Sequence, residues 1–176
     1  MTIQVGTPFP EVEKLPFAVI DGNPFATVDV KKEYAGKWLL LFSVPFAFTG
    51  LCQNELVEYN KIAKEFADRG CAMVGFSCDS QFAQQAWVAA NDELKDMKVR
   101  LISDYNKGLT SALGILSAVG SAQRATFIVD PEGMVRFAMV TDITTGRNSE
   151  EALRVLDALQ TGGFTGCNWK KGQPTL

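Results

Sequence analysis

Cysteine is the residue type in this sequence best suited to covalent chemistry. The chain has 176 residues, no histidine and four cysteines: Cys52, Cys71, Cys78 and Cys167. The cysteines form no C-x-x-C pair and are too sparse for the disulfide framework of a small secreted protein. Without histidine we expect neither a zinc site nor a Cys-His catalytic pair. A reactive thiolate must therefore be stabilised by other groups.

Cys52 stands where a strand is predicted to pass into a helix. Residues 38–44, WLLLFSV, form a continuous apolar run typical of a strand buried on both faces, and Pro45 follows it. Apolar residues in 51–69 recur at helical spacing, and Gly70 is a natural helix stop. Cys52 then falls in the first helical turn, where unpaired N–H groups and the helix dipole favour an anion.

Burial as a small apolar side chain is the alternative interpretation of each cysteine, because free cysteine is among the most frequently buried residue types. Cys71 and Cys78 fit this interpretation well, since they bracket the apolar segment AMVGFS. Cys52 fits it less well, because Thr49 offers a hydroxyl three residues earlier and Pro45 stiffens the turn. Cys52 is therefore the candidate nucleophile.

The rest of the chain alternates strand-like with helix-like segments, which is typical of an α/β domain. We expect strands at 72–76 and 101–103, a hairpin of 126–129 with 135–140, and helices after Asp79 or Ser80, near 109–113, and after Asn148 or Ser149. This order predicts a thioredoxin-like fold, with a central mixed sheet flanked by helices. Residues 1–160 would form one domain, and 161–176 an irregular, mobile tail that carries Cys167.

Composition narrows the function classes. The chain has 17 Lys and Arg against 20 Asp and Glu, a net charge of −3, which gives no basic field for a phosphate backbone. No apolar run approaches the ~18 residues that a membrane span needs. The first residues show no charged segment followed by an apolar one, as a secretory signal would. We therefore expect a cytoplasmic protein that binds neither nucleic acid nor membranes.

The spacing Pro45-x-x-x-Thr49-x-x-Cys52 resembles the active-site signature of the peroxiredoxins. Other segments, in order along nearly the whole chain, resemble the AhpC-like, typical two-cysteine branch of that family: VGTPFP, VGFSCDSQFAQQAW, RLISD, RATFIVDPEGMVR, TTGRNSEEALRVLDALQ and NWKKGQPT. The resemblance implies a thiol-dependent peroxidase of thioredoxin-like fold. It would reduce hydrogen peroxide and organic hydroperoxides without a metal, haem or flavin.

The resemblance also implies roles for the residues of the signature. Cys52 would be the peroxidatic cysteine, which attacks the terminal oxygen of a hydroperoxide and becomes a sulfenic acid. The Thr49 hydroxyl would hydrogen-bond the substrate, and Pro45 would shield the pocket from water.

Three charged residues complete the implied site. Arg124 would pair with the thiolate and hold the peroxide oxygens, Arg147 would be a second active-site arginine, and Glu55 would orient the arginines. Arginine suits this task, because its permanently charged, planar fork of donors can address sulfur and oxygen together. Without the resemblance, Arg124 would be interpreted as a solvated charge at a strand edge.

A sulfenic acid must meet a second thiol before it is oxidised further, and Cys167 is the candidate for that role. The resemblance implies that it comes from the partner subunit of a homodimer, which can assemble into a decamer. A thioredoxin-like or AhpF-like dithiol protein would then reduce the disulfide. The family's cysteine usually stands four residues before the tryptophan, where this chain has Thr165. Cys167 stands two residues before Trp169, about 7 Å further along an extended chain.

Other interpretations remain open. Gln53 and Asn54 follow Cys52 where the AhpC branch usually has Pro-Thr, and FTGLCQNE also resembles one-cysteine, AhpE-like relatives, which an external thiol reduces. A thioredoxin-fold chaperone or binding module with a vestigial Cys52 is a further alternative. A disulfide oxidoreductase is disfavoured, because no second cysteine stands three residues from Cys52.

Overall fold

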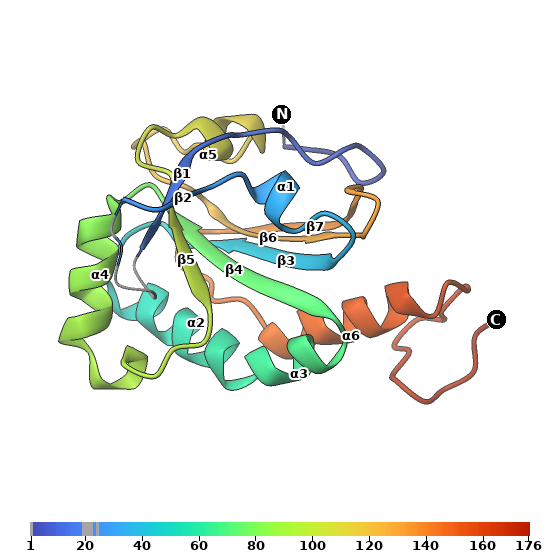
Figure 1. The fold of residues 1–176 in the computed structure, drawn as a ribbon. Coiled ribbons are helices and arrows are strands. Elements are labelled where there is room, and N and C mark those ends of the chain that lie inside the picture. Colours follow the sequence, from blue (N-terminus) through green and yellow to red (C-terminus); the bar gives the residue numbers. More distant parts are fainter. Residues whose placement is uncertain (1, 19–22, 24) are drawn as a thin grey trace.

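A single mixed sheet forms the centre of the molecule. The computed structural model describes residues 2–18, 23 and 25–176, and within them seven strands pair in the order β2-β1-β5-β4-β3-β6-β7 (Figure 1). The strands are β1 (Leu15–Ala18), β2 (Thr27–Val28), β3 (Trp38–Ser43), β4 (Cys71–Ser77), β5 (Arg100–Ser103), β6 (Arg124–Val129) and β7 (Val135–Thr141). Strands β3, β4 and β5 are parallel, whereas β1, β6 and β7 are antiparallel to their neighbours. The predicted parallel centre and antiparallel hairpin are confirmed.

Helices lie on both faces of this sheet. They are α1 (Val30–Glu33), α2 (Gly50–Lys61), α3 (Ala63–Asp68), α4 (Gln81–Ala90), α5 (Gly108–Ala112) and α6 (Ser149–Gln160), with a 3-10 turn η1 (Asp92–Leu94). Figure 1 shows α2, α3 and α6 on one face and α1 and α5 on the other, with α4 beside β1 and β5. This is the predicted architecture of a central sheet flanked by helices.

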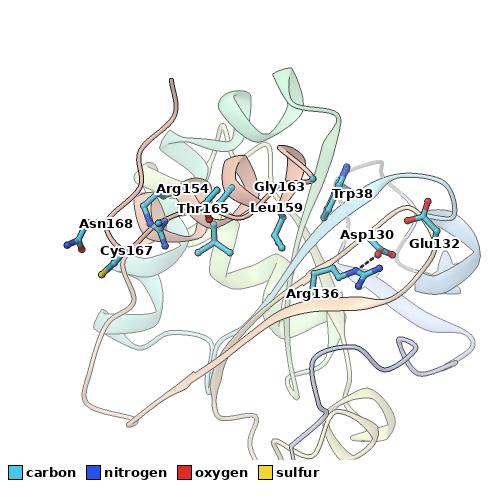
Figure 2. A pocket seen from close by; sticks show the side chains of 14 residues that line it. Trp38, Asp130, Glu132, Arg136, Arg154, Leu159, Gly163, Thr165, Cys167 and Asn168 are labelled. Atoms are coloured by element: carbon cyan, nitrogen blue, oxygen red, sulfur yellow. Dashed lines mark hydrogen bonds and ion pairs between the residues drawn. The ribbon is translucent and has the colours of Figure 1, made fainter. Parts of the chain in front are cut away.

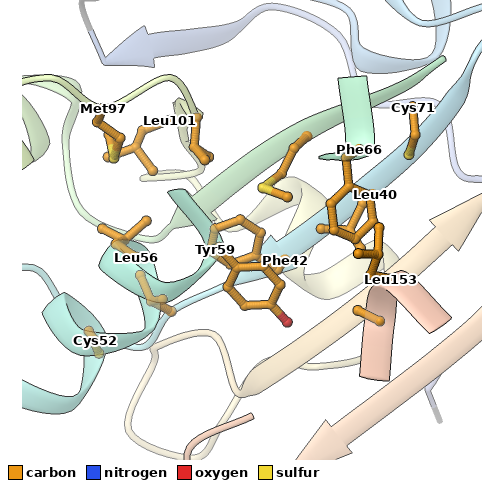
Figure 3. Close-up of a cluster of buried hydrophobic side chains, with 14 of the residues drawn as sticks. Leu40, Phe42, Cys52, Leu56, Tyr59, Phe66, Cys71, Met97, Leu101 and Leu153 are labelled. Atoms are coloured by element: carbon orange, nitrogen blue, oxygen red, sulfur yellow. The ribbon is translucent and has the colours of Figure 1, made fainter. Parts of the chain in front are cut away.

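Strand β3 contributes to both halves of the core. Leu40 and Phe42 belong to the cluster that packs against α2, α3 and α6, which Figure 3 shows. Leu39 and Leu41 point to the opposite face and join the cluster beneath α1 and α5. Successive side chains of a strand alternate between faces, so a strand buried on both sides must be apolar throughout.

Some predicted boundaries differ from the structure. The helix expected over 51–69 is divided at Ile62, whose φ of −103° and ψ of 6° interrupt it between α2 and α3. Helix α4 is capped by Ser80, whose side chain accepts a hydrogen bond from Ala83 N. Asn148 caps α6 in the same way, through Glu151 N. Each of these two caps was one of two candidates that the sequence offered.

The segment 161–176 contains neither helix nor strand, as predicted. It nevertheless contacts the body: Trp169 is only 5% exposed, and Arg154 Nη1 donates a hydrogen bond to its carbonyl oxygen at 3.2 Å. Lys171 Nζ lies 3.2 Å from Asp157 on α6. The mobility of this tail and the domain boundary at residue 160 stay predictions. No helix in the described part of the chain combines the length and apolarity of a membrane span.

Candidate active site

Cys52 lies in the first turn of α2, as the sequence predicts. Thr49 is the N-cap residue and makes no side-chain cap hydrogen bond, and the first turn carries no acidic residue. The positive end of the helix is therefore not neutralised by a carboxylate of its own. The Cys52 side chain is fully buried at the edge of the α2–α3–α6 core cluster (Figure 3). Burial alone would make it an apolar core thiol, so its polar contacts decide its chemistry.

Arg124 provides the charged contact to Cys52. It is the first residue of β6 and is 4% exposed, so its burial excludes the alternative interpretation as a solvated charge at a strand edge. Its Nη1 lies 3.3 Å from Cys52 Sγ and 2.8 Å from Glu55 Oε2. Its Nε donates to the carbonyl oxygen of Ile143 at 2.7 Å. These contacts fix the guanidinium, so that a permanently charged donor lies within hydrogen-bond distance of the sulfur.

Glu55 holds the two buried arginines in place. It lies one helical turn after Cys52, is 3% exposed, and accepts four hydrogen bonds of 2.7–2.9 Å from Arg124 and Arg147. Burial raises the pKa of this carboxyl, but the hydrogen bonds and charge of Arg147, with the charge of Arg124, outweigh burial and hold the pKa below 4.5. The carboxylate therefore stays ionised at neutral pH and compensates the arginine charges.

Arg147 supports the site without touching the sulfur. Its side chain is fully buried, and besides Glu55 it contacts the Ala125 carbonyl oxygen, at 2.6 Å from Nη1. The guanidinium carbon lies 5.6 Å from the ring centroids of Phe42 and Tyr59, within the range of cation–π attraction. In the described residues its hydrogen bonds reach Glu55 and β6, and none reaches Cys52. Arg147 thus belongs to the site through its contacts with Glu55, the carboxylate that also holds Arg124.

The two other signature residues lie in the loop between β3 and α2. Pro45 is buried, two residues beyond the end of β3. Thr49 is exposed, and its hydroxyl donates to the Phe46 carbonyl oxygen at 3.0 Å. Both residues precede Cys52 in the segment that leads into α2, and in the described part of the chain neither makes a hydrogen bond to its sulfur.

Cys71 and Cys78 have the surroundings of structural thiols. Cys71 is 3% exposed at the start of β4, and burial raises its pKa to about 12. Cys78 is partly buried after β4, with Sγ 3.4 Å from Thr110 Oγ1, and burial raises its pKa as well. A thiol with a raised pKa is a poor nucleophile near neutral pH.

The fold does not bring Cys167 together with the other candidate site residues. All four cysteines are free, and Cys167 is exposed in the tail. It lines a groove of about 920 Å³ between the tail, α6 and the β6–β7 turn, shown in Figure 2 with Arg154 beside it and the Asp130–Arg136 ion pair opposite. The groove's lining includes none of Cys52, Arg124 and Glu55.

Within the described residues, one group of carboxylates lies close enough together to share a metal cation: Glu11, Glu13 and Asp29. Lys32 Nζ already lies 3.2 Å from Glu13 and 2.7 Å from Asp29, so a lysine charge compensates the group. None of these residues belongs to the cluster around Cys52.

One hydrogen bond near the site was not predicted from the sequence. Asp79, considered only as a helix cap, accepts a hydrogen bond from the backbone N–H of Ala47 at 2.8 Å, within the loop that precedes Cys52. One sign of this contact is visible in the sequence. Two residues that can cap a helix, Asp79 and Ser80, stand in succession, and only one of them can cap α4.

Comparison with known proteins identifies the family and the fold of this chain. The model of the AhpC/TSA family matches residues 5–138. Alkyl hydroperoxide reductase C of Mycolicibacterium smegmatis is 40% identical, with 99% of this chain and 93% of that protein covered. The solved structure of Mycobacterium tuberculosis AhpC has a TM-score of 0.85 at 36% identity, covering 97% of this chain and 100% of that one. A reduced 2-Cys peroxiredoxin of Plasmodium vivax has a TM-score of 0.90 at 28% identity, covering 98% of this chain and 92% of that one.

These likenesses span nearly the whole chain and confirm the predicted thioredoxin-like fold and peroxiredoxin resemblance. The chain belongs to the AhpC/TSA family of peroxiredoxins.

Proposed function

We propose that this thiol-dependent peroxidase reduces hydrogen peroxide and organic hydroperoxides through Cys52. The thiolate attacks one peroxide oxygen, so an S–O bond forms as the O–O bond breaks. Cys52 becomes a sulfenic acid, and the other oxygen takes a proton and leaves as water or an alcohol. The names of the alkyl hydroperoxide reductase C relatives support organic hydroperoxides as part of the substrate class.

The observation that carries this proposal is the 3.3 Å contact between Arg124 Nη1 and Cys52 Sγ. A peroxide is small and neutral, so it offers the protein little binding energy. Catalysis must come from donors already oriented towards the charge that develops as the O–O bond breaks. A guanidinium held by Glu55 and the Ile143 carbonyl is such a donor.

Trapping of the sulfenic acid tests the proposal. In Cys167→Ser, where Cys167 cannot consume the sulfenic acid, dimedone added with one equivalent of hydrogen peroxide is expected to label Cys52. It should leave Cys71 and Cys78 unlabelled, because burial raises the pKa of both of these thiols. Peptide mass spectrometry locates the adduct, and Cys52→Ser is the control that should give none. Equal labelling of Cys71 or Cys78 in Cys167→Ser would refute Cys52 as the reacting thiol.

We further propose that Cys167 of the partner subunit resolves the sulfenic acid in a homodimer, which can assemble into a decamer. The exposure of Cys167 supports this role, since Cys71 is buried and Cys78 partly so. A disulfide needs Cα atoms within about 7 Å, so Cys167 of one subunit must come that close to Cys52 of the other. A thioredoxin-like or AhpF-like dithiol protein would then regenerate both thiols. The cytoplasm is the proposed compartment, because it keeps thiols reduced.

A non-reducing gel separates the possible resolving thiols. After one equivalent of hydrogen peroxide, the wild type and Cys71→Ser should migrate as disulfide-linked dimers, and Cys167→Ser as a monomer. A dimer band for Cys167→Ser would exclude Cys167 as the resolving cysteine. A wild type without any dimer band would instead favour the one-cysteine route, in which an external thiol reduces Cys52.

A further inference from the structure

The carboxylate of Asp79 joins the loop after β4 to the loop after β3. We propose that Asp79 is a positioning residue of the peroxide reaction, which holds the loop 45–49 so that Thr49 and Pro45 keep their places beside Cys52. This inference rests on the proposed function of Cys52. Asp79 does not contact the sulfur; it acts through the backbone of Ala47.

The contact itself is short and crosses between two parallel strands. Asp79 Oδ2 accepts one hydrogen bond from Ala47 N at 2.8 Å and another from Ser77 Oγ at 2.8 Å. Strands β3 and β4 pair in parallel, and Val44 N continues the ladder to the Phe76 carbonyl oxygen at 2.9 Å. Both loops therefore leave the sheet at the same edge, and one carboxylate oxygen can bind the two of them together.

Buried polar residues hold Asp79 in turn. Ser77, Gln84 and Ser103 are each at most 1% exposed. Gln84 Nε2 donates to Ser77 Oγ at 2.9 Å and to the Ile102 carbonyl oxygen at 2.9 Å. Ser103 Oγ donates to the Asp79 carbonyl oxygen at 2.7 Å. Side chain and main chain of Asp79 are thus both fixed, and a buried hydrogen-bond network of this kind specifies one position rather than several.

Few hydrogen bonds determine the path of the loop that Asp79 holds, although Ala47 packs against the core cluster and the Phe48 ring centroid lies 6.5 Å from that of Trp87. Phe48 has a φ of +59°, in the left-handed region that non-glycine residues rarely adopt, and Thr49 makes no side-chain cap hydrogen bond. In the described part of the chain, the bond from Ala47 to Asp79 is the one hydrogen bond that ties residues 46–49 to a segment other than the loop and α2. A strained loop keeps its conformation only when its surroundings impose it.

The chemical consequence concerns peroxide more than the thiolate. A peroxide must lie within reach of the sulfur and of the loop's donors at once, and a shift of about 1 Å in a positioning group costs up to ~100-fold in rate. Asp79→Ala is therefore expected to lower the second-order rate constant of Cys52 with hydrogen peroxide by about 10- to 100-fold. Alkylation of Cys52 by iodoacetamide needs a thiolate but no loop donor, so its rate should be unchanged or higher.

Asp79→Asn and Asp29→Ala are the matched variants. The amide oxygen of an asparagine side chain can accept both bonds that Asp79 Oδ2 accepts, so the Asp79→Asn rate with peroxide should stay within about threefold of wild type. Asp29 also accepts a backbone N–H, from Lys32, but at the start of α1 on the other face of the sheet. Asp29→Ala should therefore leave both rates unchanged.

Stopped-flow peroxide reaction and timed alkylation, both well below the unfolding temperature, give these rates. A peroxide rate of Asp79→Ala within twofold of wild type would overturn the proposal. An equal fall in the peroxide and alkylation rates of Asp79→Ala would also overturn it, and so would an Asp79→Asn variant that reacts with peroxide as slowly as Asp79→Ala. If wild type and Cys52→Ser consume peroxide equally, the proposed function has failed. If the reaction depends on Cys52 and Asp79→Ala is unaffected, only this inference has failed.

Discussion

Replacing Arg124 with methionine is expected to slow the reaction of Cys52 with hydrogen peroxide by about 100- to 1,000-fold, the range found when one oriented donor to a developing charge is removed. Arg124 lies 3.3 Å from Cys52 Sγ, and Glu55 and the Ile143 carbonyl oxygen hold its guanidinium. Methionine fills similar space but supplies no charge to the thiolate and no donor to the peroxide. Stopped-flow measurement of the second-order rate constant gives the effect.

Arg136→Met is the matched control for this prediction. Arg136 lies on the neighbouring strand β7, its side chain is 45% exposed, and it forms an ion pair with Asp130. The loss of Arg136 changes the net charge as much as the loss of Arg124 does, but the ion-pair partner of Arg136 is Asp130 and not Glu55. The peroxide rate of Arg136→Met should therefore stay close to that of wild type. Arg124→Lys retains the charge but not the planar fork, and should recover only part of the rate. A rate for Arg124→Met near the wild-type value would contradict the assignment of Arg124.

Replacing Glu55 with glutamine should destabilise the protein by about 3–5 kcal/mol, the cost of removing one partner from a buried ion pair. Glu55 is the carboxylate between Arg124 and Arg147, whose side chains are 5% and 0% exposed. Glutamine has nearly the same shape but no charge, and its amide N–H groups would face donors. The change in the free energy of unfolding can be measured with urea and tryptophan fluorescence.

The pH dependence distinguishes loss of the charge from loss of packing. The pKa of Glu55 is lowered in the folded protein from 4.5, so its stabilising contribution is present above pH 4.5 and is lost as the pH falls through the lower, folded-state value. The gap in unfolding free energy between wild type and Glu55→Gln should therefore be largest near pH 7 and shrink below pH 4.5. A gap that stays constant with pH would show that the charge is not its cause.

Glu58→Gln is the control on the same helix. Glu58 pairs with Lys61, and both side chains are well exposed, at 46% and 62%. An exposed helical ion pair three residues apart contributes about 0.2–0.5 kcal/mol. The variant should therefore unfold within about 1 kcal/mol of wild type. A similar loss in both variants would mean that burial between the arginines is not what makes Glu55 important.

Local features of the chain were predictable because their causes are local. The apolar run 38–44 determines a strand buried on both faces, and the start of helical spacing after it places Cys52 in the first turn of α2. The caps at Ser80 and Asn148 follow from side chains that bond their own helix. The break at Ile62 was not predictable, since no glycine or proline marks it and the apolar spacing continues across it.

The site required contacts between distant segments. Glu55 and Arg147 are 92 residues apart, and Arg124 is 72 residues from Cys52. These residues meet because β6 pairs antiparallel with β3, with Thr126 opposite Phe42, so that β6 begins where β3 ends. No local pattern specifies which strands become neighbours or in which register. For this reason the roles of the arginines came from family resemblance, and Asp79 was considered only as a helix cap.

The sequence by itself determined that Cys52 begins a helix at the end of a buried strand, because periodicity and capping act over a few residues. Only the tertiary structure decided which charged side chains surround that cysteine. Strand pairing brings Arg124 to the sulfur, Glu55 between two buried arginines, and Asp79 to the loop before α2. Cys167 lies in a groove whose lining includes none of them.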